Sequence, residues 1–189
     1  TSACAPTVTT CVSTFTVTAD VPPTITTCAV TRNLTGCTTS VITSPPFSAT
    51  SASSTEAVFE SPPNSGNTSD NCGIVSVSYI DVATGVCPIV VTRTWTVTDV
   101  CGNTATCNQT INITDSTNPT ITCPANITIS CTASTLPATT GTATASDNCT
   151  ASPVVTYTDV TTALPSCPQE YTITRTWRAQ DNCGNFVTC

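Results

Sequence analysis

A strict two-residue alternation runs through two stretches of this chain, 91–98 and 171–177. The first reads VTRTWTVT and the second YTITRTW, so that threonine separates each aliphatic, aromatic or arginine residue from the next. Successive side chains of a strand point to opposite faces. The alternation therefore predicts strands with one face toward a core and a threonine face toward solvent.

The composition extends this prediction to the whole chain. Lysine and methionine are absent and leucine and glutamate are rare, so strong helix formers are scarce. Threonine, valine and isoleucine dominate, and β-branched residues favour strands. The 14 prolines and the recurring Cys-Gly-Asn turns divide the chain into short segments. We expect an all-β protein built of sandwiches.

The chain also repeats itself. DNC at 70–72 returns at 147–149, TRTW at 92–95 returns at 174–177, and CGN at 101–103 returns at 183–185. Repetition of this kind predicts tandem units, which we place at 21–115 and 116–189. The first unit carries a Ser/Pro-rich insertion at 44–69, which we expect to form a long surface loop.

The N-terminal residues resemble the end of a unit. CVSTFTVTAD at 11–20 matches CNQTINITD at 107–115, the segment that closes the first unit. No such segment follows Cys189, the counterpart of Cys107. We therefore interpret residues 1–20 as an extra strand and the second unit as lacking its last strand.

This extra strand predicts assembly by strand donation, in which it completes the second unit of a neighbouring copy. Phe15 and Val17 would enter the gap, because they stand where Ile111 and Ile113 stand in the first unit. A head-to-tail contact repeats into a filament or stalk rather than closing into a dimer. The alternative is a fragment of a long tandem-repeat cell-surface adhesin, in which the extra and missing strands only mark the cut.

Three short motifs stand out: PTITCPANI at 119–127, ASDNC at 145–149 and TDVCGNTATC at 98–107. They resemble the hyalin repeat (HYR), especially the HYR-like tandem repeats of large bacterial surface proteins. The resemblance covers most of residues 21–189. It implies immunoglobulin-like β-sandwiches with structural or adhesive roles and no catalysis. It also implies the disulfides Cys28–Cys107 and Cys123–Cys189, each joining the first strand of a unit to its last.

The chain has 14 cysteines, an even number that suits complete pairing into seven disulfides. Zinc is the rival ligand, but His and the CxxC spacing are both absent. Disulfides require an oxidising compartment, so we expect an extracellular or cell-surface protein. Local pairs such as Cys101–Cys107 remain open. The predicted disulfide cysteines are Cys4, Cys11, Cys28, Cys37, Cys72, Cys87, Cys101, Cys107, Cys123, Cys131, Cys149, Cys167, Cys183 and Cys189.

The charge pattern excludes several functions. A net charge of -7 with 8% charged residues gives no basic footprint for nucleic acid, and no apolar run is long enough for a membrane helix. Without His, a serine nucleophile would have no imidazole base, so we expect no catalytic residues and no enzyme activity. A carbohydrate-binding accessory module is a further alternative. It would need an exposed aromatic platform, whereas Trp95 and Trp177 are expected in the core.

The aspartates occupy repeated positions: Asp20 matches Asp115, Asp70 matches Asp147, Asp81 matches Asp159, and Asp99 matches Asp181. Carboxylates at junctions between units suit Ca²⁺, which takes 6–8 oxygen ligands. The alternative is that aspartate before Asn or Gly only makes turns and caps. The candidate calcium ligands are Asp70, Asp99, Asp115, Asp147 and Asp181; no other cofactor is expected.

Two further groups of residues carry expectations. Arg93 and Arg175 share a strand face with tryptophan, which predicts an ion pair with a repeated aspartate. Glycans are expected on outward-facing sequon asparagines, with Asn112 and Asn126 the best candidates. The alternative is that the threonine-rich faces only replace charge. The predicted glycosylation sites are Asn33, Asn67, Asn108, Asn112, Asn126 and Asn148.

Overall fold

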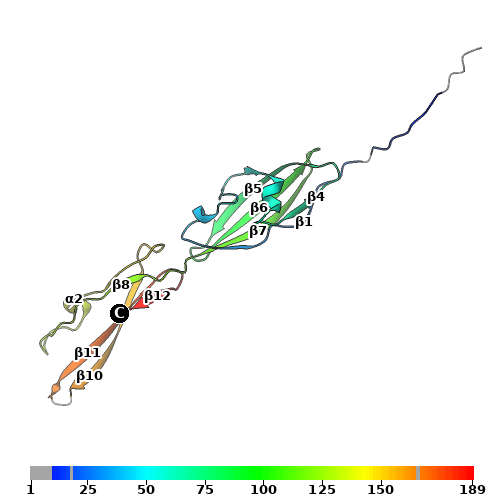
Figure 1. The fold of residues 1–189 in the computed structure, drawn as a ribbon. Coiled ribbons are helices and arrows are strands. Elements are labelled where there is room, and N and C mark those ends of the chain that lie inside the picture. Colours follow the sequence, from blue (N-terminus) through cyan, green and yellow to red (C-terminus); the bar gives the residue numbers. More distant parts are fainter. Residues whose placement is uncertain (1–9, 18, 165–166) are drawn as a thin grey trace, which may run out of the picture.

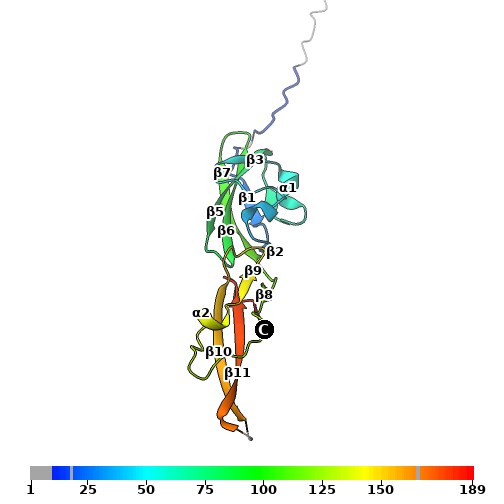
Figure 2. The same ribbon diagram turned by 90° about the vertical axis from the view of Figure 1, so that its left-hand side faces the viewer.

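The computed structural model of the chain describes residues 10–17, 19–164 and 167–189, without the side chains of 167–169. Residues 21–115, the first unit, and residues 116–189, the second unit, follow one another along one elongated axis (Figure 1). The view turned by 90° shows the same arrangement (Figure 2). Residues 10–17 form no helix or strand and extend beyond the first unit, away from the second.

The all-β prediction is confirmed. The first unit contains β1 (Thr24–Thr27), β2 (Arg32–Thr35), β3 (Ala52–Ser54), β4 (Asn67–Ser69), β5 (Ile74–Thr84), β6 (Ile89–Asp99) and β7 (Thr104–Thr114). The second unit contains β8 (Thr120–Thr122), β9 (Thr144–Ser146), β10 (Val154–Leu164), β11 (Cys167–Gln180) and β12 (Phe186–Thr188). The helical segments are η1 (Thr39–Val41), α1 (Glu56–Glu60) and α2 (Pro137–Thr140). In the described part of the chain, no helix has the length and apolar character needed to cross a membrane.

The first unit is built on a five-stranded sheet in the order β2-β7-β6-β5-β3. Strands β5, β6 and β7 form an antiparallel meander, and β2 adds to β7 in parallel. A separate antiparallel pair, β1–β4, packs with α1 on one face of this sheet through a shared core. The alternation in β6 appears as predicted, since Val91, Arg93, Trp95 and Val97 are buried and the threonines between them are not.

Trp95 is the centre of the first core. Its ring lies 5.2 Å from Phe59 in an edge-on contact and 5.4 Å from Tyr79. Phe59 belongs to the insertion at 44–69, so the expectation of a plain surface loop is wrong. The insertion supplies β3, α1 and β4, and it buries Phe59 completely. The Ser/Pro-rich composition does not predict this role in the core, because a single aromatic residue, Phe59, makes the contact with Trp95.

The second unit has fewer paired strands among its described residues. Strands β10, β11 and β12 form one antiparallel sheet, and β8 pairs with β9. Trp177 is buried in β11 and contacts Tyr157 of β10 at 5.1 Å between ring centroids. Both tryptophans therefore lie in a core, as predicted from the alternation.

Candidate functional site: the unit junctions and an open strand edge

The two sides of β11 are paired to different extents. On one side, β10 pairs with it in a long antiparallel ladder. On the other side, β12 pairs only with residues 178–180, and the main chains of Trp177 and Cys189 exchange two hydrogen bonds of 2.8 and 3.0 Å. Residues 171–176 have no strand partner on this side within the described chain. We refer to them as the open edge of β11.

In the first unit, the same side of the matching strand is fully paired. Trp95 of β6 lies opposite Cys107 of β7, as Trp177 lies opposite Cys189. Beyond Cys107, the ladder continues through residues 108–113 of β7. The open edge is therefore the part of β11 that corresponds to the β6 residues paired with 108–113.

The exposure of the apolar side chains differs between the two units in the same way. Ile111 and Ile113 of β7 are buried in the first unit, at 0% and 1% exposure. Beside the open edge, Tyr171 is 49% exposed. In the segment that matches β7, Phe15 and Val17 are 87% and 81% exposed. Residues 1–9 and 18 of the predicted donor strand lie outside the described residues.

The segment matching β2 also differs between the units. Residues 32–35 of β2 pair in parallel with residues 111–114 of β7. The matching segment of the second unit, 124–130, forms no strand, and its Ile127 is 53% exposed. One strand with the sequence pattern of β7 would thus contact two groups of residues that have no strand partner there in the described part of the chain, 124–130 and the open edge.

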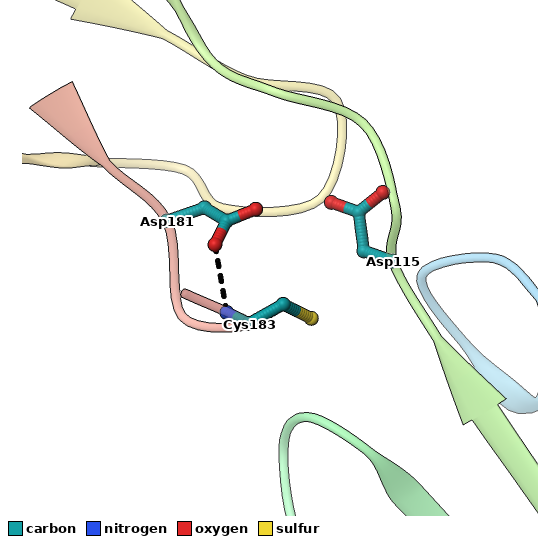
Figure 3. A group of neighbouring side chains, drawn as sticks. All are labelled: Asp115, Asp181 and Cys183. Atoms are coloured by element: carbon teal, nitrogen blue, oxygen red, sulfur yellow. Dashed lines mark hydrogen bonds between the residues drawn. The ribbon is translucent and has the colours of Figure 1, made fainter. Parts of the chain in front are cut away.

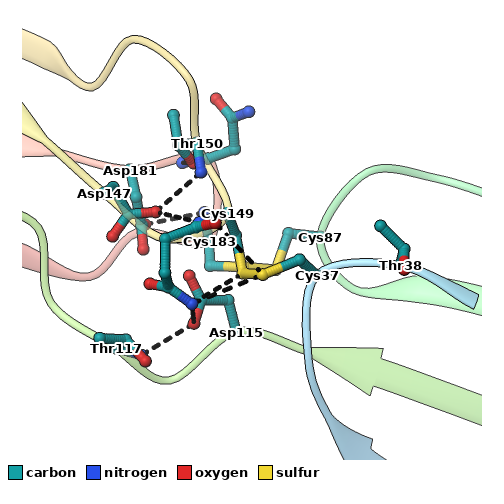
Figure 4. Close-up of a disulfide and its surroundings, with 12 residues drawn as sticks. Cys37, Thr38, Cys87, Asp115, Thr117, Asp147, Cys149, Thr150, Asp181 and Cys183 are labelled. Atoms are coloured by element: carbon teal, nitrogen blue, oxygen red, sulfur yellow. Dashed lines mark hydrogen bonds between the residues drawn. A yellow bond between two sulfur atoms is a disulfide. The ribbon is translucent and has the colours of Figure 1, made fainter. Parts of the chain in front are cut away.

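Two disulfides join the units to one another (Figure 4). Cys37 is bonded to Cys149, with 4.9 Å between the Cα atoms, and Cys87 is bonded to Cys183, with 5.0 Å. In each pair the first cysteine belongs to the first unit and the second to the second unit. The junction between the units is therefore covalently linked twice outside the main chain.

Two further disulfides lie inside the units. They are Cys28–Cys107 and Cys123–Cys189, the two pairings that the HYR resemblance implies. The local alternative Cys101–Cys107 is wrong, because Cys107 is bonded to Cys28 across the core.

The expectation of complete pairing is not met within the described part of the chain. Cys11, Cys72, Cys101 and Cys131 are unpaired and exposed. Cys4 and the side chain of Cys167 lie outside the described structure. Cys101 follows β6 at the end opposite to Cys87, so it lies at the end of the first unit that faces away from the second. Within one chain, no other unit lies beside Cys101 with which it could form a disulfide like those of the junction.

Three aspartates converge at this outer end of the first unit. One carboxylate oxygen each of Asp20, Asp70 and Asp99 lies within 4.8 Å of the others. The Asp70 Oδ1 atom accepts backbone hydrogen bonds from Cys72 and Gly73, which is the turn geometry that the simpler interpretation expects. The Asp70 Oδ2 and Asp20 Oδ1 atoms are buried and have no hydrogen-bond partner in the described chain.

The junction between the units brings together two of the matching carboxylates, Asp115 and Asp181. Oxygens of Asp115 and Asp181 lie within 4.8 Å of each other, and the two carboxylates face across a gap (Figure 3). The third member of that group, the Cys183 sulfur, is held in a disulfide. Asp147 lies beside them (Figure 4), and its Oδ1 atom and the Asp115 Oδ2 atom are buried without a described partner.

The sequence predicted five of these six aspartates as calcium ligands but not Asp20. Its match with Asp115 was the available signal. Asp99 also shows the effect of its surroundings. Burial alone would raise the pKa of Asp99, but hydrogen bonds from the side chain and backbone of Asn103, and from the backbone of Cys101 and Gly102, lower it below its ordinary value. The carboxylate is therefore held in its charged form.

The pKa values of the two thiols beside this cluster are raised, whereas that of Asp99 is lowered. A hydrogen bond with Asp20, followed by burial and the charges of Asp20 and Asp70, raises the pKa of Cys72 to about 11. The same interactions with Asp20 raise the pKa of Cys101. Both thiols are therefore protonated at neutral pH.

Both predicted ion pairs of arginine with a repeated aspartate are confirmed. Arg93 binds Asp81 at 2.8 Å, and Arg175 binds Asp159 at 2.7 Å. Arg32 and Arg178 instead bond to Ser44 and Gln180. None of the four arginines of the chain has a hydrogen bond with the aspartates of either cluster within the described part.

The sequon asparagines lie in different surroundings. Asn126 is exposed in the segment that forms no strand, and Asn112 is half-buried, with its Nδ2 atom 2.8 Å from Asn33 Oδ1. The Nδ2 atom of Asn148 points into the junction, 3.4 Å from Asp115 Oδ1 and 3.0 Å from the Cys149 sulfur. The remaining candidates Asn33, Asn67 and Asn108 are exposed.

Comparison with known proteins adds no assignment: no family model matches the sequence, and no curated protein matches it. The resemblance to HYR repeats therefore rests on the short motifs alone.

Proposed function

We propose that the protein is a structural subunit of an extracellular filament or stalk, built from two HYR-like, immunoglobulin-like β-sandwiches that assemble head to tail by strand donation. The observation that carries the proposal is the exposure of Phe15 and Val17, at 87% and 81%, in a segment with the sequence pattern of β7. The open edge of β11, as the described residues present it, is the surface that such a strand would fit. Unpaired strand edges recruit other strands, because their N–H and C=O groups are unsatisfied.

Residues 12–20 of a second copy are the proposed occupant. If they follow the register of β7 on β6, Phe15 lies opposite Ile173 and Val17 opposite Tyr171, since Ile111 and Ile113 lie opposite Val91 and Ile89. Burying two large apolar side chains contributes roughly 3–6 kcal/mol. The six residues of the open edge would also gain a hydrogen-bonded ladder.

The same strand would serve the segment at 124–130. In the first unit, β7 is held between β6 and β2. A donated strand between β11 and residues 124–130 would give the second unit the same strand order. Ile127, which is 53% exposed, would then lie beside a neighbouring strand as Leu34 lies beside Ile113.

Other features support the extracellular and glycosylated parts of the proposal. Four disulfides within the described chain are consistent with an extracellular protein. Most of the sequon asparagines are exposed. A chain with only 8% charged residues would gain solubility from attached sugars.

The test compares the full chain with a variant that lacks residues 1–20. Electron microscopy should show filaments for the full chain and none for the truncated chain. A synthetic peptide of residues 11–20 should bind the truncated chain one to one, because its second unit still presents the open edge. A scrambled peptide of the same composition serves as the control.

Filaments from the truncated chain that match those of the full chain would overturn strand donation. They would favour the second interpretation, a segment of a longer tandem adhesin in which residues following Cys189 fill the edge. Absence of filaments from both chains would reject assembly altogether.

A further inference from the structure

We propose that successive copies are also linked by disulfides, with Cys72 and Cys101 of one copy bonded to Cys131 and Cys167 of the preceding copy. This inference rests on the head-to-tail order of the proposed function. It adds a covalent link that strand donation does not require. It also gives a partner to three of the four exposed cysteines that are unpaired in the described chain.

The argument starts from the junction inside the chain. There, two cysteines of the first unit, Cys37 and Cys87, are bonded to two cysteines of the second unit, Cys149 and Cys183. Cys87 lies just before β6, and Cys183 follows β11, so the disulfide joins opposite ends of matching strands. Any pair of units stacked in this way presents the same two pairs of sulfurs.

The repeat then identifies the cysteines of the next junction. Cys37 matches Cys131, Cys87 matches Cys167, Cys72 matches Cys149, and Cys101 matches Cys183. Each unit thus carries two cysteines at either end. Among the described residues, disulfides between units join only the inner ends. The repeat then assigns Cys72 and Cys101 to the outer end of the first unit, and Cys131 and Cys167 to the outer end of the second.

Strand donation would bring these outer ends together in the geometry of the inner junction. In the first unit, β7 leads through Asp115 directly into the second unit. A donated strand at 12–17 leads through Asp20 directly into the next first unit. Asp20 and Asp115 are held by matching asparagines: Asn103 Nδ2 donates to Oδ2 of Asp20, and Asn185 Nδ2 donates to the main-chain oxygen of Asp115.

Formation of each bond is an oxidation. Two thiols lose two protons and two electrons and form one S–S bond, while a disulfide oxidant accepts both and becomes two thiols. Disulfide oxidants of this class are present in the compartments where secreted proteins form their disulfides.

The test uses filaments assembled from an equal mixture of unlabelled and ¹⁵N-labelled full chains. After the free thiols are alkylated, mass spectrometry of unreduced proteolytic peptides should find Cys72 joined to Cys131 in mixed-isotope pairs, which only a bond between copies can give. Cys101 should be joined to Cys167 in the same way. On a denaturing gel without reductant, the filaments should run as a ladder of multimers that reductant collapses to one band.

The double variant Cys131→Ser/Cys167→Ser should lose the ladder but still form filaments. The control is Cys11→Ser, which removes an exposed cysteine that matches Cys189 and has no partner at a junction; its ladder should remain. A Cys72–Cys101 bond within one copy, or alkylated thiols at all four positions in intact filaments, would overturn the inference. Failure of the proposed function is distinct, because then microscopy would show no filaments.

A second inference stands on the carboxylates and does not depend on assembly. We infer that each aspartate cluster binds one calcium ion, one at the outer end of the first unit and one at the junction. Asp115 is only 4% exposed, and its Oδ2 atom has no described hydrogen-bond partner while facing another carboxylate. Turn formation uses only one oxygen of Asp70 and Asp147, so it leaves the others unexplained.

The negative charges of the outer cluster also favour a bound cation. The oxygens of Asp20, Asp70 and Asp99 lie within 4.8 Å of one another, and no arginine hydrogen-bonds to them in the described chain. Like charges at this separation repel, and a divalent cation with oxygen ligands removes the repulsion. The Asp115 and Asp181 carboxylates would hold the second ion, and Asp147 beside them would supply a further oxygen.

The test is calorimetric titration of the full chain with CaCl₂ after treatment with a chelator. We expect two ions per chain for the wild type and one for either Asp115→Asn or Asp70→Asn. The control Asp159→Asn removes a carboxylate that pairs with arginine, so it should keep two. Thermal unfolding adds a second measurement.

In chelator, Asp115→Asn should be at least as stable as the wild type, because it relieves repulsion; in calcium it should be less stable. A purely structural role of Asp115 would lower stability equally in both conditions. Unchanged stoichiometry in both cluster variants, or no heat of binding for the wild type, would overturn the inference.

Discussion

Arg93 and Asp81 face each other across β6 and β5 with both side chains completely buried. The guanidinium donates two hydrogen bonds of 2.8 Å to the two carboxylate oxygens and lies 4.3 Å from the centre of the Tyr79 ring. The second unit repeats the pair as Arg175 and Asp159, but beside the open edge these side chains remain 12% and 30% exposed.

The difference in burial predicts a difference in stability. Asp81→Asn leaves a buried guanidinium without its counter-charge, and we expect the first unit to lose about 3–5 kcal/mol of unfolding free energy. Asp159→Asn should cost clearly less, because water still reaches that pair. Urea unfolding followed by tryptophan fluorescence measures each unit, with Trp177→Phe or Trp95→Phe as the background. Equal losses in the two units would contradict the prediction.

The exposed pair also predicts a pH dependence. Hydrogen bonds from Arg175 lower the pKa of Asp159 below its ordinary value of 3.8, against a smaller effect of burial. A lowered folded-state pKa stabilises the fold above the ordinary value, and this contribution is lost as the pH falls through the folded-state pKa. The second unit should therefore weaken below about pH 4. Urea unfolding at pH 5 and pH 3 tests this, and Asp159→Asn should reduce the difference; an undiminished difference would assign it to other carboxylates.

Strand donation predicts that alternate residues of the N-terminal segment differ in importance. Phe15→Ser in the full chain should raise the protein concentration needed for filaments by about tenfold or more, since burial of such a side chain contributes roughly 1.5–3 kcal/mol. Thr16→Ser changes the next residue, which would face outward, and should leave that concentration nearly unchanged. Sedimentation of filaments across a dilution series measures both. A similar effect of both substitutions would argue against a strand at this position.

The surroundings of the sequons predict which of them carry sugar. Asn126 is exposed and Asn112 lies on the outer face of β7, so both should be glycosylated in native material. Asn148 should be unmodified, because the other two residues of its sequon are held in the junction: Cys149 is bonded to Cys37, and Thr150 is only 6% exposed. Mass spectrometry of the corresponding peptides decides this. Unmodified Asn112 and Asn126, or a glycan on Asn148, would refute the assignment.

The sequence predicted some of these features better than others, for physical reasons. The alternation at 91–98 predicts β6 because a strand buried on one face must repeat every two residues. The repeated cysteines showed which residues of the two units are equivalent. They could not show which ends of the units meet, because that depends on the direction of the strands in the fold. The pairing of Cys37 with Cys149 therefore emerged only from the fold. The convergence of Asp20 with Asp70 and Asp99 was missed for the same reason, since the three residues come from separate segments of the chain.

The insertion at 44–69 gives the last prediction, because its contribution to the core was not visible in its composition. Phe59 is completely buried against Trp95, and Gly66 lies so close that an added Cβ would be 2.4 Å from the Phe59 ring. Phe59→Ala should cost the first unit about 3–5 kcal/mol through lost burial and the cavity left behind. The control Val58→Ala, at a residue 37% exposed in the same helix, should cost about 1 kcal/mol or less. Urea unfolding monitored by Trp95 fluorescence measures both; a loss from Phe59→Ala no larger than that from Val58→Ala would show that the insertion is dispensable to the core.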